Sequence, residues 1–106
     1  MSRVLPLLTI VATALWLTTG VATAARAADI ELGRYLATEC MTCHRSATDT
    51  TAIPNIFGVA ESSLANVIKA YRDKQLPNAV MQNIAGRLTD DEIAALALYF
   101  SKTSKP

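Results

Sequence analysis

The sequence predicts a small all-α domain, and three observations lead to that class. Apolar residues recur at helical spacing in two stretches, at positions 64, 67, 68 and 71 and again at 93, 96, 97 and 100. The second stretch follows Thr89-Asp90-Asp91-Glu92, a capping box that is typical of a helix start. No run of residues has the alternation or the turn spacing of a β-hairpin. At 106 residues, the chain has room for one domain.

The N-terminal quarter predicts an export signal. Arg3 provides a short positive region, residues 4–17 are apolar, and Ala25-Arg26-Ala27 places small residues at both recognition positions of a cleavage site. We therefore expect residues 1–27 to be a signal peptide and the protein to be exported to the periplasm. Cleavage after Ala24 or Ala28 would fit the same pattern.

Removal of this segment would leave a mature domain at residues 28–106, with eight basic and nine acidic side chains. A balance this close to zero provides no basic face for nucleic acid or for an anionic membrane surface. We expect neither as a partner of the mature form. If the signal were not cleaved, the stretch between Arg3 and Arg26, which carries no charge, would anchor the protein in a membrane.

The first predicted helix covers residues 29–40, with Asp29 as a candidate N-cap and apolar residues at 30, 32 and 36 along one face. Residues 45–60, which come after the motif described below, are polar and irregular apart from an apolar group at 53–58, so we expect a loop there.

The second predicted helix carries the apolar positions 64–71, and Ser62 or Ser63 could cap its start. It should end just before Pro77, because a proline forces the preceding residue out of the α region. A second loop, containing Met81, would then lead to the third helix after Thr89. The domain should thus contain three main helices.

Cys40-Met41-Thr42-Cys43-His44 is the stretch with the most specific chemistry, because Cys-x-x-Cys-His is the attachment motif of a c-type haem. Residues three and four apart share one face of a helix, so both thiols and the imidazole can reach one porphyrin. Cys40 and Cys43 would form thioethers with the haem vinyl groups, and His44 would provide an axial nitrogen. The sequence therefore predicts one covalently bound haem c.

Other uses of two nearby cysteines have to be considered. A disulfide needs no partner beyond the pair, whereas a thioredoxin-like redox pair belongs next to a βαβ pattern, which this sequence lacks. A zinc site needs four ligands, and with two cysteines and one histidine in the chain an acidic residue such as Glu39 would have to complete it.

Met81 is the candidate for the second axial ligand. His44 is the only histidine in the chain, so a bis-histidine site within one chain is excluded. Of the three methionines, Met1 would leave with the signal, and Met41 lies between the two cysteines on the His44 side. Elimination therefore favours Met81 over its ordinary role as a core-filling residue.

Pro54 is a candidate for orienting the histidine. A ligating histidine usually donates its other ring N–H to a carbonyl or carboxylate. Pro54, ten residues after His44, could provide that carbonyl, or it could only stiffen the loop.

On these residues the chain resembles the class I c-type cytochromes, and most closely the small single-haem members and the cytochrome subunits of flavocytochrome c sulfide dehydrogenases. The resemblance rests on residues 40–44, 53–56, 80–85 and 88–100. It implies a small class I cytochrome c fold, with three main helices around one covalently bound haem.

We expect the protein to be an electron carrier and not an enzyme, because two axial side chains would leave the iron no position for a substrate. Its partner would be a redox protein, such as a flavoprotein dehydrogenase or a terminal oxidase. Two alternatives remain: the haem subunit of a larger dehydrogenase, and a sensor of gas or another small ligand if one axial position is open.

Overall fold

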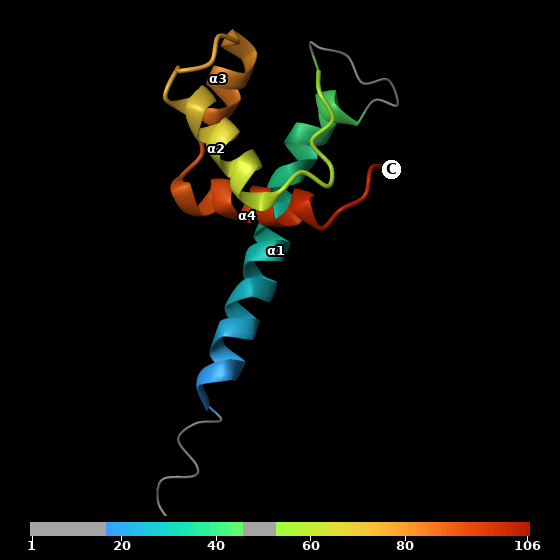
Figure 1. Ribbon diagram of the computed structural model, residues 1–106, viewed down its shortest axis with the longest axis vertical. Helices are drawn as coiled ribbons and strands as arrows, with labels where there is room; N and C mark the ends of the chain where they lie inside the picture. Colours follow the sequence, from blue (N-terminus) through green and yellow to red (C-terminus); the bar gives the residue numbers. More distant parts are fainter. Residues whose placement is uncertain (1–16, 46–52) are drawn as a thin grey trace, which may run out of the picture.

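The computed structural model describes residues 17–45 and 53–106, and within these ranges it contains four α-helices and no strand. The helices are α1 (Leu17–His44), α2 (Glu61–Arg72), α3 (Ala79–Ala85) and α4 (Asp90–Ser101). Figure 1 shows α4 crossing α1 near its middle, with α2 and α3 on one side of the crossing and the C-terminal half of α1 on the other. The predicted all-α class is confirmed.

Helix α1 is longer than expected, because it begins at Leu17 and not near Asp29. Five alanines lie between residues 22 and 28, and alanine has the highest helix propensity, so the helix continues through the expected start. Asp29 is therefore inside the helix, and its prediction as an N-cap is wrong. Of the predicted signal segment at residues 1–27, residues 1–16 lie outside the described residues. Among the helices that are described, none is both long enough and apolar enough to cross a bilayer.

Gly33 allows α1 and α4 to approach closely. A Cβ atom at Gly33 would lie 2.1 Å from the carbonyl oxygen of Ala95 and 2.8 Å from Cβ of Tyr99. No side chain fits in that space, so the two backbones can cross only where α1 carries a glycine. One turn further along α1, Ala37 is fully buried against the same core.

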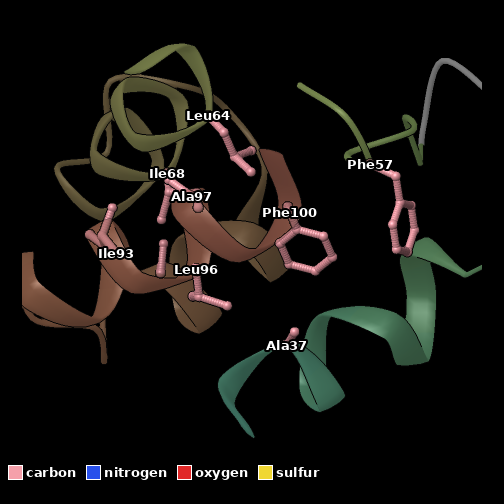
Figure 2. Packing of buried hydrophobic residues seen from close by; sticks show 9 residues of the cluster. Ala37, Phe57, Leu64, Ile68, Ile93, Leu96, Ala97 and Phe100 are labelled. Carbon is pink, nitrogen blue, oxygen red and sulfur yellow. The ribbon is translucent and has the colours of Figure 1, made fainter. Parts of the chain in front are cut away.

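The hydrophobic core lies around α4 and combines side chains from α1, α2 and the 53–60 segment. Figure 2 shows Ile93, Leu96 and Phe100 of α4 pointing inward among their neighbours. The rings of Phe57 and Phe100 pack edge to face with centroids 5.3 Å apart. This contact fixes the 53–60 segment, which forms neither helix nor strand, over the C-terminal part of α4.

Helix α2 differs from the prediction at both ends. It begins at Glu61 after an extended Ala60, so both candidate serines are within its first turn and neither caps it. It ends at Arg72, before the expected stop, because Lys74 adopts a left-handed conformation with φ of 58°. The predicted face is largely correct, since Leu64 and Ile68 are buried.

Helix α3 replaces the loop predicted around Met81. Asn78 is extended, and its side-chain Oδ1 accepts a hydrogen bond from the Met81 backbone N–H at 3.0 Å, which makes Asn78 the N-cap of the helix. At seven residues, α3 is too short for hydrophobic periodicity to reveal it.

The start of α4 is as predicted. Thr89 Oγ1 accepts from the Glu92 N–H at 3.2 Å, and the Glu92 carboxylate accepts from the Thr89 N–H at 3.0 Å. These reciprocal bonds form the capping box and begin the helix at Asp90.

Candidate functional site

One cavity of about 350 Å³ contains all five residues that sequence reasoning selected. Cys40, Cys43 and His44 line it from the last turns of α1, Pro54 lines it from the 53–60 segment, and Met81 lines it from α3. In Figure 1 these elements lie on both sides of the space above α4. Side chains from distant parts of the chain therefore converge on a single site.

The two cysteines lie on consecutive turns of α1 and differ in exposure. Cys40 is half-buried and Cys43 is exposed, and both are free thiols. Burial, together with the nearby negative charge of Glu39, raises the pKa of Cys40 to about 11. At neutral pH the structure therefore holds Cys40 as a neutral thiol against an apolar wall.

His44 is oriented by a backbone carbonyl. Its Nδ1 lies 2.8 Å from the carbonyl oxygen of Pro54. A carbonyl oxygen can only accept, so Nδ1 must carry the proton. In the neutral ring this leaves Nε2 with a free lone pair, which is the form of histidine that binds metals.

The turn after Pro54 holds this carbonyl in place. Asn55 Oδ1 accepts from the Phe57 N–H at 3.1 Å, which is a side-chain mimic of a backbone turn. Gly58 follows with a φ of 71°, and its N–H donates to the Phe100 carbonyl at 2.9 Å. The turn is thus attached to α4 at one end and reaches His44 at the other.

Met81 and Met41 occupy different environments. Met81 lines the cavity at the first turn of α3, and its own backbone N–H is the one that Asn78 caps. Met41 is not among the cavity residues and packs against the hydrophobic core. Of the two methionines in the described ranges, only Met81 lines the cavity together with His44.

The remaining walls are mostly apolar. The sequence alone did not assign to the site these members of the walls, several of which lie on predicted apolar helix faces: Leu64, Val67, Ile68, Ile84 and Phe100. Among the described residues, every fully buried side-chain nitrogen or oxygen atom has a hydrogen-bond partner.

This set of residues fits a haem. Two thiols and an imidazole with a free Nε2 are grouped on one wall, a thioether sulfur is on the other, and apolar side chains lie between them. These are the groups through which c-type haem is attached and ligated, and the apolar walls suit a flat hydrophobic macrocycle.

The alternative uses of the cysteines gain no support. In residues 17–45 and 53–106 no group of three or more His, Cys, Asp and Glu side chains could hold a metal ion, as a zinc site would require. The βαβ surroundings of a thioredoxin-like motif are also missing from the described part of the chain.

Two curated proteins are similar to this chain, whereas no protein-family model matches it. It is 35% identical over 82 residues to "Cytochrome c-554(548)" of Halomonas halodenitrificans, an alignment that covers 71% of this chain and 96% of that protein. It is 32% identical over 69 residues to the "Thiosulfate dehydrogenase electron acceptor" of Thiomonas intermedia, covering 62% of this chain. The chain spans about a third of the length of this second relative, at 32%.

Proposed function

Because the chain belongs to the class I c-type cytochromes, we propose that it is a single-haem electron carrier in which His44 and Met81 are the two axial ligands. The family establishes a haem electron-transfer protein. The observation that supports the finer assignment is the convergence of Cys40, Cys43, His44 and Met81 on one apolar cavity.

Each residue has a defined task in this proposal. Bound haem supplies a one-electron iron couple. Cys40 and Cys43 attach it through thioether bonds, and His44 presents Nε2 while its Nδ1–H stays on the Pro54 carbonyl. Met81 provides a soft sulfur ligand, which favours the reduced state. The apolar side chains keep water away from these groups.

Two protein ligands favour a carrier over a sensor or an enzyme. A small molecule could bind at the iron only after displacing Met81 from its position at the start of α3. Electron exchange needs no such displacement.

A pair of methionine substitutions tests the axial assignment. The oxidised wild-type protein at neutral pH should show a near-infrared sulfur-to-iron charge-transfer band. Met81→Leu should abolish it, and Met41→Leu, a change of the same size at the core-packed methionine, should leave it in place. A band that survives in Met81→Leu would rule out Met81 as the ligand.

Covalent attachment has its own test. Acid–acetone extraction should leave the haem on the wild-type polypeptide, and the intact mass should exceed that of the chain by one haem. Cys40→Ala combined with Cys43→Ala should yield a protein from which haem is extracted or which contains none. Extractable haem in the wild type would contradict the thioether assignment.

We further propose that the protein acts in the periplasm after removal of residues 1–27. Among the ion pairs of the described residues, removal would break the surface pair of Arg26 with Glu61 at 3.6 Å, and exposed pairs contribute little to stability. The intact mass of the protein from a periplasmic extract should correspond to a chain that begins at residue 28. An N-terminal peptide that includes residues 4–17 would support a membrane anchor instead.

The partner we propose is an oxidoreductase that donates electrons to this protein. One relative is named as an electron acceptor of thiosulfate dehydrogenase, which motivates a dehydrogenase of reduced sulfur compounds as the first partner to examine. Stopped-flow mixing of such a reduced dehydrogenase with the oxidised protein should reduce the haem, and no reduction would direct the search to other donors such as flavoproteins.

The rim of the cavity supports a second candidate function, in which the protein is the haem subunit of a larger dehydrogenase. Val80, Val67 and Ile53 line the cavity and are 63%, 44% and 40% exposed. Exposed apolar side chains grouped at a site are typical of a stable protein contact. Size-exclusion of native protein at low salt discriminates: a haem peak at monomer size with no co-eluting protein supports the carrier.

A further inference from the structure

The two walls of the cavity are connected only indirectly by helix packing. His44 and the cysteines are on α1, which packs against α4, whereas Met81 is on α3, which packs against α2; α2 in turn packs against α4. Within the described ranges α3 and α1 do not pack directly on each other, although Ala85 of α3 belongs to the core around α4. A direct contact between the two walls would therefore add to the positioning of Met81 relative to His44.

The segment that carries Met81, residues 76–88, is held together by its own hydrogen bonds. Asn78 caps the Met81 N–H, and Gln82 Nε2 donates to the Leu76 carbonyl at 2.8 Å. At the other end, the Gly86 N–H donates to Gln82 O at 2.9 Å and the Leu88 N–H to Ala85 O at 3.0 Å. These bonds extend from one end of the segment to the other, which favours its movement as one unit.

One long-range ion pair connects this segment to the opposite wall. Arg87 Nη2 donates to Glu39 Oε1 at 2.5 Å, between residues 48 positions apart. Glu39 lines the cavity and directly precedes Cys40. The end of the 76–88 segment is also held by α2. Arg72 Nη1, on α2, donates to Asp90 at 2.7 Å and lies 3.5 Å from the Leu88 carbonyl oxygen.

We propose that the Glu39–Arg87 pair is a clasp that holds the 76–88 segment against α1 and so positions the Met81 sulfur toward His44. This rests on the proposed role of Met81 as a ligand. Glu39 and Arg87 are positioning residues. Their side chains are 55% and 60% exposed, and exposed ion pairs add little to global stability. The clasp therefore disfavours local opening of the 76–88 segment more than it disfavours unfolding of the whole protein.

Displacement of Met81 by imidazole in the oxidised haem protein measures this opening. Imidazole is the probe because its neutral form is not steered by charge. Glu39→Gln and Arg87→Gln should each tighten imidazole binding about two- to fivefold, the range expected for loss of an exposed ion pair. The matched control is Glu31→Gln, which breaks a comparable surface pair with Arg34 at 3.4 Å on the same helix and should bind imidazole like the wild type.

The two variants also separate positioning from a simple charge effect. Glu39→Gln removes a negative charge and Arg87→Gln removes a positive one, so a direct field effect on the iron would change imidazole affinity in opposite directions. Loss of the clasp changes it in the same direction. Glu39→Lys combined with Arg87→Glu should restore the pair and return the affinity toward the wild-type value.

Met81 itself provides the remaining control. In a Met81→Leu background, Arg87→Gln should have no effect on imidazole affinity, because the ligand positioned by the clasp is absent. The proposal is overturned if the single variants match Glu31→Gln or shift affinity in opposite directions. If the wild-type charge-transfer band is missing, or survives in Met81→Leu, the axial assignment fails and the clasp fails with it; a normal band with unchanged imidazole binding rejects the clasp alone.

Discussion

At the scale of single residues, the orientation of His44 depends on the side chain of Asn55. It does not touch the histidine, but its Oδ1 bonds the Phe57 N–H and closes the turn that presents the Pro54 carbonyl. Replacing it would leave a partly buried N–H without a partner.

Asn55→Ala should therefore lower the free energy of unfolding by about 1 kcal/mol, the usual contribution of one such hydrogen bond. Guanidinium denaturation of the haem protein measures this. Asn66→Ala, on the exposed side of α2, is the control and should be neutral or slightly stabilising because alanine favours a helix. Equal stability of the two variants would show that the turn does not need the Asn55 side chain.

At the scale of elements, the crossing of α1 and α4 depends on Gly33. An added methyl group would meet backbone atoms of Ala95, which cannot rotate away as a side chain can. The helices would have to separate, and the core contacts of Ala37 and Leu96 would loosen.

Gly33→Ala should destabilise the protein by about 1–3 kcal/mol, because overpacking at a backbone contact outweighs the helix propensity that alanine adds. Thermal unfolding followed by circular dichroism at 222 nm, a wavelength typical of helices, checks it, because about 1 kcal/mol shifts the midpoint of a domain of this size by about 4–8 °C. Thr38→Ala, at an exposed position of the same helix, should leave the midpoint nearly unchanged. A Gly33→Ala protein as stable as this control would mean that the crossing adjusts without cost.

Arg72 joins two elements and gives the whole molecule a pH dependence. Its guanidinium donates to Asp90 and Asp73, linking the end of α2 to the start of α4. A hydrogen bond from Arg72 and its positive charge lower the pKa of Asp90 below the ordinary value of 3.8. A carboxyl group with a lowered pKa stabilises the fold above its ordinary pKa, and this contribution is lost as the pH falls through the lowered value.

Asp90→Asn should therefore be less stable than the wild type at neutral pH, and the difference should shrink as the pH falls below about 3.8. Denaturation midpoints measured from pH 7 to pH 2 would show the two curves converging. Asp91→Asn changes the neighbouring residue of the same helical turn and controls for the general effect of charge at a helix N-terminus. Parallel curves for Asp90→Asn and wild type would show that the Arg72 pair does not stabilise the fold.

The cavity also affects the molecule as a whole, because an apolar space of about 350 Å³ separates the α1 wall from the 76–88 segment. A haem-free protein, made by changing Cys40 and Cys43 to alanine, should keep the α1–α4 crossing but lose order in that segment first. Hydrogen–deuterium exchange should show faster exchange in 76–88 than in 90–100. Equal protection of both regions would mean that the empty site is as rigid as the crossing.

Local patterns in the sequence determined much of this description. The capping box at Thr89 begins α4 where predicted, since its bonds span only three residues. The spacing of Cys40, Cys43 and His44 placed three groups on one helix face, and the elimination of Met41 agrees with its core packing. The family was also recognisable from these short stretches, because they contain the residues that we propose hold the cofactor. The assignments of haem attachment, axial ligation and export remain predictions.

Only the tertiary structure decided the rest, because the interactions concerned join residues far apart in the chain. Helix α3 has one polar cap and seven residues, too few for a periodic signal, and it is supported by packing on α2. The need for glycine at position 33 follows from a backbone 62 residues away, and the Glu39–Arg87 pair follows from how the 76–88 segment is placed relative to α1. A sequence pattern records neighbours along the chain, whereas these contacts depend on how the helices cross in space.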